Sequence, residues 1–325
     1  MSDRMHAVRI KVHIVTVLLL LLALLPGCGE EKKSAFSEGL TYEDYSEDAS
    51  LPKGSRGSKL SCLTVSSPGE RVFGSKEIAI IDVSNASEGY VSAQYFGDCG
   101  KVKFQITLPD GTVYSYNLSG NIEYFPLPGG DGEYTLGVYE NITETQYAIA
   151  LSETLEVKIE NEFGPSLYPN QYCMFDESTK FVQKGVDLSY SMNSDLDLVT
   201  NVFDYVLCTM SYDVEKAETI GKGYVCNLDE IYETRKGICL DYAAIMACIL
   251  RSQGIPTRLQ VGYAGTAYHA WISIYLNEKG WVNGLIEFDG ENWSLMDPTL
   301  ADNEATDKLV NFIGDGSNYT QKYVY

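Results

Sequence analysis

The 325-residue sequence predicts an α+β protein, in which an all-β domain precedes a domain of helices followed by an antiparallel sheet. Apolar residues make up 45% of the chain and charged residues 21%, which is enough apolar material to bury a core. Residues 61–165 alternate apolar and polar side chains in short runs between turn residues. From residue 166 the apolar spacing becomes helical, and after residue 257 it returns to alternation.

Charge and histidine content exclude several classes of protein. Lys and Arg total 24 against 45 Asp and Glu, so the net charge of −21 repels phosphate backbones and no nucleic-acid partner is expected. The three histidines are His6, His13 and His269, so a zinc site that needs two histidines cannot form beyond residue 13. None of the eight cysteines belongs to a Cys-x-x-Cys pair, which excludes zinc ribbons and thioredoxin-type motifs. We expect no metal and no cofactor.

The N-terminal residues have the pattern of an export signal. Basic residues lie within 4–11, an apolar run covers 14–25, and Gly27-Cys28 follows. The run is too short to span a ~30 Å hydrocarbon core comfortably. We therefore predict a signal peptide over residues 1–27, with an uncleaved anchor as the alternative. Gly27-Cys28 resembles a bacterial lipobox, which implies lipidation of Cys28 and a location on the extracytoplasmic face of the cell membrane. Residues 28–60 are mostly polar and are predicted to be a flexible tether.

The first domain, 61–165, is predicted to consist of short strands. In 101–108, apolar Val102, Phe104 and Ile106 alternate with polar neighbours, and Pro109-Asp110-Gly111 then provides a turn into the next strand at 112–118. About 100 residues of this kind predict an immunoglobulin-like sandwich. No chemically active side chains converge in it, so a spacing or binding role is expected.

The second domain, 166–325, is predicted to place helices before strands. Ser194-x-x-Asp197 resembles a capping box at the start of the first helix, and 239–253 is apolar on nearly every face, as in a buried helix. The expected helices end near 210, 235 and 253, and the expected strands are 258–263, 269–276, 281–288 and 293–297.

Cys239 is the candidate nucleophile, although a lone cysteine is more often a small buried hydrophobe. It lies at the predicted start of the buried helix, where unpaired N–H groups favour a thiolate. Gly237 allows a close backbone approach that leaves room for a substrate carbonyl. The backbone N–H of Cys239 is one candidate oxyanion donor, and Tyr212 and Tyr232 are candidate side-chain donors.

A cysteine nucleophile needs a base, and His269 is the one imidazole beyond the export signal. Alternation in 269–276 places His269 and Trp271 on the face opposite the apolar positions, so His269 is expected away from the core. Asp297 ends a predicted strand because Pro298 cannot continue it, and a carboxylate there could orient the imidazole.

These residues lie in motifs that occur in a fixed order: Thr234–Ala243 (TRKGICLDYA), Gly254–Arg258 (GIPTR), Gly262-Tyr263, His269–Trp271 (HAW) and Asp297–Thr299 (DPT). The set resembles the transglutaminase-like superfamily of papain-type cysteine enzymes. The resemblance implies Cys239 as nucleophile, His269 as general base and Asp297 as its orienting partner. It also implies a papain-like α+β fold for the second domain.

The leading hypothesis is therefore a tethered cysteine enzyme that attacks peptide or glutamine carboxamide bonds and resolves a thioester with water or an amine. Its expected partners are a protein or peptide substrate and, through the N-terminal lipid, the membrane. The chain is expected to be a monomer. The alternative is a catalytically silent transglutaminase-like domain that serves binding or adhesion.

Overall fold

The computed structural model describes residues 52–221, 223–283, 285–288, 293–296 and 319–325. All of them belong to one compact unit, Gly39–Tyr325. The predicted signal peptide, the predicted lipidation site Cys28 and the predicted orienting residue Asp297 lie outside the described residues. Within the described part of the chain, no helix is long and apolar enough to cross a membrane.

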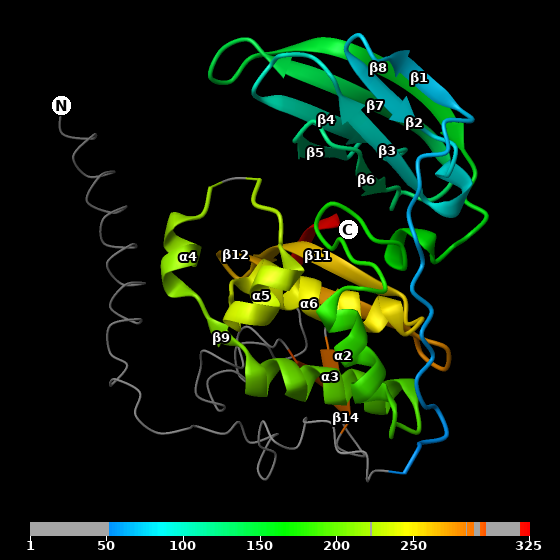
Figure 1. The fold of residues 1–325 in the computed structure, drawn as a ribbon, viewed down its shortest axis with the longest axis vertical. Helices are drawn as coiled ribbons and strands as arrows, with labels where there is room; N and C mark the ends of the chain where they lie inside the picture. Colours follow the sequence, from blue (N-terminus) through cyan, green and yellow to red (C-terminus); the bar gives the residue numbers. More distant parts are fainter. Residues whose placement is uncertain (1–51, 222, 284, 289–292, 297–318) are drawn as a thin grey trace, which may run out of the picture. The chain divides into compact units, whose positions relative to one another are not determined.

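The first part of the described chain forms two four-stranded antiparallel sheets (Figure 1). One sheet has the order β1 (Val72–Ser75), β2 (Ala79–Asp82), β3 (Tyr90–Tyr95) and β6 (Glu123–Pro126). The other has the order β5 (Val113–Leu118), β4 (Val102–Thr107), β7 (Gly132–Asn141) and β8 (Tyr147–Val157).

The core of this domain lies between the two sheets. In β4, Val102, Phe104 and Ile106 are buried and their neighbours are not, as the alternation predicts. The Phe104 ring lies 4.6 Å, between centroids, from that of Phe125 on β6 of the facing sheet. The sheets therefore pack face to face as a β-sandwich.

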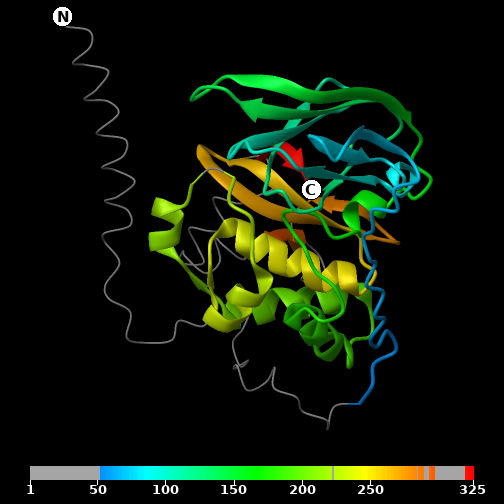
Figure 2. The same ribbon diagram turned by 45° about the horizontal axis from the view of Figure 1, so that its top comes forward.

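After the sandwich, in the segment predicted to form the second domain, the chain continues with η3 (Gly164–Ser166), α2 (Lys180–Ser189), α3 (Asp195–Thr209), α4 (Val214–Thr219), α5 (Leu228–Thr234) and α6 (Cys239–Ser252). The predicted capping box is confirmed at α3, where Ser194 Oγ accepts a hydrogen bond from Asp197 N and Asp197 Oδ2 accepts one from Ser194 N. Helix α6 is buried from Asp241 to Ser252, because it packs against α2, α3 and α5 and against the sheet. Figure 2 shows this helix in yellow against the orange strands.

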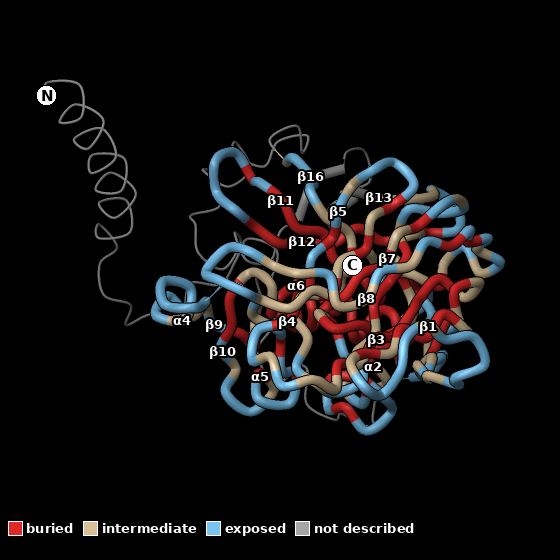
Figure 3. The backbone as a smooth tube through the Cα atoms, turned by 90° about the horizontal axis from the view of Figure 1, so that it is seen from above, coloured by how far each residue is buried: buried red, intermediate tan, exposed pale blue. Residues whose placement is uncertain are grey.

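The sheet of this domain has the order β13 (Gly280–Asn283), β12 (Ala267–Leu276), β11 (Thr257–Ala264) and β16 (Tyr319–Val324), all antiparallel. The predicted strand 281–288 is instead divided between β13 and β14 (Leu285–Phe288), and β14 pairs with β15 (Trp293–Met296). Two short strands, β9 (Ser211–Tyr212) and β10 (Lys236–Gly237), pair in parallel. Figure 3 shows β11 and β12 as mostly buried strands.

The sandwich and the second domain share an aromatic contact. The ring of Tyr325, which is 6% exposed, lies within 6 Å of the rings of Tyr114 and Tyr116 in β5 and 4.4 Å from that of Tyr172. The backbone N–H of Val324 also donates to the Tyr114 hydroxyl at 3.0 Å. These contacts continue the core of one domain into the other.

Residues 52–60 do not form part of a flexible tether, contrary to the prediction for 28–60. Gly54 N donates to the carbonyl of Tyr190 at 3.0 Å, and Ser58 Oγ donates to that of Val186 at 2.7 Å. Arg56 is 7% exposed and pairs with Asp195. The polar composition of this segment therefore reflects hydrogen bonding to the α2–α3 region of the second domain.

Candidate active site

Cys239 is the first residue of α6 and is partly exposed. The chain reaches it through a sharp change of direction after α5, where Arg235 adopts a left-handed conformation with φ of 54°. Ile238, in the extended region, then caps the helix. Cys239 thus lies where the first N–H groups of a buried helix have no partner within the helix.

Four of the other thiols are poor nucleophiles. Burial raises the pKa of Cys173, Cys226 and Cys248. Burial, followed by the negative charges of Glu177 and Asp176, raises the pKa of Cys62 to about 11. These thiols stay protonated at neutral pH, and only a thiolate is a strong nucleophile.

His269 lies on β12, against which α6 packs. Its ring stacks on Trp271 with centroids 6.2 Å apart and lies 6.3 Å from the Tyr319 ring, so the predicted common face with Trp271 is confirmed. However, His269 is only 7% exposed, because this sheet is covered on both faces. His269 was expected away from the core, and this expectation is wrong because the side chain is buried.

Tyr268, the neighbour of His269 in β12, has a pKa that is raised first by burial and then by the nearby phenols of Tyr323 and Tyr263 and the thiol of Cys239. Because side chains alternate along a strand, Tyr268 points to the face opposite His269, and it is 62% exposed. Met296, the last residue of β15, directly precedes the predicted site residue Asp297, which itself lies outside the described residues.

Of the two predicted side-chain oxyanion donors, Tyr212 lies near the start of α6. The β9–β10 pairing places Tyr212 opposite Gly237, two residues before the nucleophile. Burial, followed by the charges of Cys239 and Asp241, raises the pKa of Tyr212 to about 12, so its hydroxyl stays protonated and can donate. Tyr232 instead packs against Phe181 and beneath the Arg235 guanidinium.

Sequence reasoning missed a polar network at the start of α6. Asp241 is completely buried, and its carboxylate accepts hydrogen bonds from Ile238 N at 2.9 Å, Lys216 Nζ at 2.7 Å and Tyr224 Oη at 2.7 Å. Lys216 Nζ also donates to Tyr224 Oη at 2.6 Å. An acidic residue in the first turn of a predicted helix was the available signal.

Gly237 has a structural role that the sequence did not indicate. A Cβ at this position would lie 2.7 Å from Cβ of Asp241, which is closer than real Cβ atoms approach other atoms. The glycine therefore makes room for the Asp241 side chain, and its role in admitting a substrate carbonyl stays a prediction.

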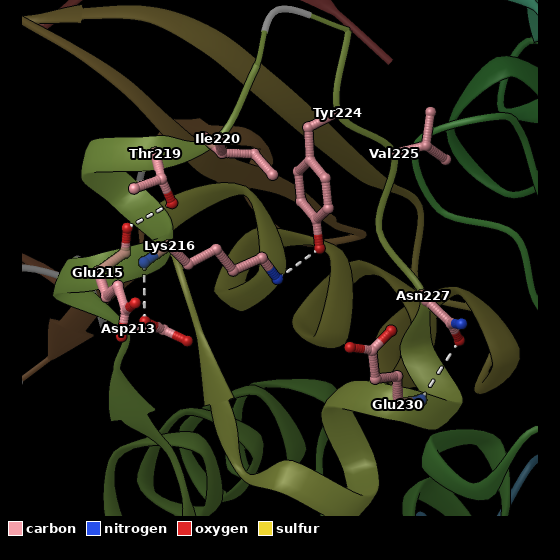
Figure 4. Close-up of a pocket in the computed structure, with 9 residues that line it drawn as sticks. All are labelled: Asp213, Glu215, Lys216, Thr219, Ile220, Tyr224, Val225, Asn227 and Glu230. Carbon is pink, nitrogen blue, oxygen red and sulfur yellow. Dashed lines mark hydrogen bonds between the residues drawn. The ribbon is translucent and has the colours of Figure 1, made fainter.

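A groove of about 440 Å³ lies on the outer side of this network, between α4 and α5. Figure 4 shows Lys216 and Tyr224 meeting in its wall, with Glu230 on the opposite side. Asp213 and Glu215 also line it, so three of its four charged lining residues are acidic. The described residues contain no cluster of His, Cys, Asp and Glu that could hold a metal ion.

The Cys239 thiol lies at the start of a buried helix that packs against an antiparallel sheet, as the resemblance to the transglutaminase-like superfamily implied. The family model of the transglutaminase-like superfamily matches residues 186–284, which include α3 to α6, β11 and β12. This domain belongs to the transglutaminase-like superfamily, and the resemblance found in the sequence is confirmed.

Three curated relatives are similar to parts of the chain. The uncharacterised protein YebA of Bacillus subtilis is 26% identical over 200 residues, covering 54% of this chain and 27% of YebA. A protein-glutamine gamma-glutamyltransferase of Pseudomonas aeruginosa is 35% identical over 69 residues, 17% of this chain and 10% of that protein. UPF0252 protein MJ1282 of Methanocaldococcus jannaschii is 25% identical over 224 residues, 62% of each chain. The chain thus spans less than two thirds of each relative.

Solved structures with partial similarity include a candidate cysteine protease from Cytophaga hutchinsonii and the transglutaminase of red sea bream. The first is 17% identical, with a TM-score of 0.33, over 65% of this chain and 67% of that chain. The second is 13% identical, with a TM-score of 0.25, over 66% of this chain and 49% of that chain. Both likenesses are distant.

Proposed function

We propose that the protein is a cysteine enzyme that breaks peptide or glutamine carboxamide bonds through a thioester on Cys239. The observation that carries the proposal is the position of this partly exposed thiol at the N-terminus of the buried helix α6, within a transglutaminase-like domain. The helix end supplies N–H groups that favour both a thiolate and a developing oxyanion.

In the first step, the Cys239 sulfur attacks the carbonyl carbon and the carbon–nitrogen bond breaks. His269 takes the thiol proton and delivers it to the departing amine or ammonia. Asp297 orients the imidazole and stabilises its charged form. In this proposal, the backbone N–H of Cys239 and the Tyr212 hydroxyl donate to the oxyanion; the support is the pairing of Tyr212 with Gly237 and the raised pKa of Tyr212.

In the second step, water or an amine attacks the thioester and releases the acyl group from sulfur. Water gives a protease, amidase or deamidase, and an amine gives an acyltransferase. Hydrolysis is favoured for a tethered bacterial protein, and the name of the Pseudomonas relative supports acyl transfer as the second outcome.

A labelling experiment tests the nucleophile. The full chain is treated with substoichiometric iodoacetamide at neutral pH, and the modified peptides are quantified by mass spectrometry. Preferential modification of Cys239 is expected, whereas the thiols with raised pKa, such as buried Cys248, react slowly. A Cys239 that reacts no faster than the other thiols would support the silent binding domain instead.

A substrate profile then separates the two reactions. Casein, peptidoglycan peptides and glutamine donors are offered with and without a primary amine. Ammonia or peptide release without amine incorporation identifies a hydrolase, and incorporation of the amine identifies an acyltransferase. Cys239→Ala is the matched control, and turnover that survives this substitution contradicts the proposal.

We also propose that the enzyme works on the extracytoplasmic face of the membrane, held by lipid on Cys28, with the immunoglobulin-like sandwich as a spacing or binding domain. The support is the order of basic residues, apolar run and Gly27-Cys28 in the sequence. Cys28→Ser should release the protein or leave an unprocessed precursor, as judged by cell fractionation and intact mass. Unchanged retention and processing would instead indicate a plain anchor.

A further inference from the structure

A buried ion pair lies at the start of the helix that carries the nucleophile. Asp241 is completely buried and Lys216 is mostly buried, with Nζ and Oδ2 2.7 Å apart. Removing two charges from water costs several kcal/mol per ion, so such a pair adds little net stability. Its position two residues after Cys239 indicates a role in the site.

The network fixes the peptide groups on both sides of Ile238. The N–H of the Gly237–Ile238 peptide is held by the Asp241 carboxylate at 2.9 Å. The carbonyl of the Ile238–Cys239 peptide accepts hydrogen bonds from Asp241 N and Tyr242 N, so it points into the helix. Because a trans peptide is planar, the N–H of Cys239 must then point out of the helix end.

We propose that Asp241, together with Lys216 and Tyr224, is a positioning residue that holds the Cys239 N–H toward the carbonyl oxygen of the substrate. This rests on the proposed function. Asp241 touches no substrate; it acts through Ile238, because its carboxylate holds the Ile238 N–H and its backbone N–H holds the Ile238 carbonyl. Lys216 neutralises the buried carboxylate, which would otherwise oppose a thiolate two residues away.

Several titratable groups surround the Asp241 carboxylate. Lys216 on α4, Tyr224 and Cys226 in the loop before α5, and Tyr212 on β9 all interact with it, and Glu215 and Glu230 line the groove outside. Burial is the first cause of the raised pKa of Tyr224 and of Cys226, so both stay protonated as donors. Lys216 is thus the cation in contact with the carboxylate in the described part of the site.

The first test needs no substrate. The alkylation rate of Cys239 by iodoacetamide is measured from pH 5 to 10 in the wild type, Lys216→Met, Asp241→Asn and the double variant. Lys216→Met should move the midpoint of the rate profile up by about one pH unit, because an unpaired carboxylate opposes the thiolate. Asp241→Asn should move it down, and the double variant should return it near the wild type.

Lys180→Met is the matched control, because Lys180 also pairs with a carboxylate and lies over a tyrosine ring, but on α2. Its profile should match the wild type. Identical midpoints in the wild type, both single variants and the double variant would overturn the proposal. If Asp241→Asn does not fold, the comparison of Lys216→Met with the wild type still decides it.

The second test is steady-state turnover of a glutamine donor. In Asp241→Ala, kcat should fall about 10²-fold with KM nearly unchanged, as when one oxyanion donor is lost. A folded Asp241→Ala enzyme with wild-type kcat overturns the positioning role and leaves the proposed function intact. If the wild type turns over no carboxamide at all, the proposed function fails, and the alkylation profiles alone decide the role of Asp241.

Discussion

Arg56 Nε lies 2.6 Å from Asp195 Oδ1, and this ion pair joins a segment that precedes the sandwich to the first turn of α3. The Arg56 side chain is 2% exposed, and it also donates to the carbonyls of Gly57 and Gln253. The chain therefore first packs against the second domain, then forms the sandwich, and then forms the rest of the second domain. Residues 52–60 are a structural part of the domain that carries Cys239.

Arg56→Met should lower the free energy of unfolding by about 2 kcal/mol, because it leaves Asp195 without its partner and the Gln253 carbonyl without a donor. Urea unfolding of the full chain measures the change. Lys180→Met, which removes an exposed ion pair with Glu233, should leave stability unchanged within error and serves as the control. Equal stability of the Arg56 variant and the wild type would show that the segment is not anchored.

Composition could not predict this segment. Ser, Gly and Lys in 52–60 are typical of a linker, and nothing local shows that Arg56 is buried. Its partners Asp195 and Gln253 are more than 130 residues away in the chain. Such contacts depend on the tertiary fold, and local sequence patterns do not show which distant residues it brings together.

Periodicity predicted the elements whose faces differ in burial. The strand at Val102–Thr107 and the start of α3 at Ser194 are confirmed, and the buried helix predicted over 239–253 is observed over 239–252. Strand β16, with its exposed polar residues, has little apolar contrast and was missed. The Asp241–Lys216–Tyr224 network was missed because its members come from three separate segments.

Cys239→Ala should abolish turnover and leave the melting temperature nearly unchanged. The thiol lies at the mouth of α6 and is partly exposed, so its loss leaves no closed cavity. Thermal unfolding and turnover are measured on the same preparation. As a comparison, Cys248→Ala in the buried part of α6 should lower stability and spare the chemistry. A Cys239→Ala protein that loses several kcal/mol of stability would identify Cys239 as a packing residue.

Asp82→Asn should destabilise the sandwich at neutral pH and much less in acid. Burial alone would raise the pKa of Asp82, but hydrogen bonds from Ser84, Gly69 and Ser67 outweigh it and lower the pKa below its usual 3.8. The stabilisation is therefore present above the unfolded pKa and is lost as the pH falls through the folded value.

The expected loss at pH 7 is about 2 kcal/mol, the value of charge-assisted hydrogen bonds to a buried carboxylate. Urea unfolding of the wild type and Asp82→Asn, repeated from pH 7 to pH 2.5, measures the difference. A difference that stays constant across this range would show that the charge of Asp82 contributes nothing to stability.

His269 and Asp297 should act as one unit, so that losing both costs little more than losing His269. In the proposed mechanism Asp297 has no chemistry of its own, because it only orients and stabilises the imidazole. The His269 ring lies 6.2 Å from the Trp271 ring and 6.3 Å from the Tyr319 ring, between centroids, and these two rings restrict the imidazole but carry no charge. Single and double variants, His269→Ala and Asp297→Asn, are compared by kcat/KM against pH. Asp297→Asn should shift or flatten the limb below neutrality. Losses that multiply, together with an unchanged pH profile, would show instead that the two residues act independently and that Asp297 only ends the strand before Pro298.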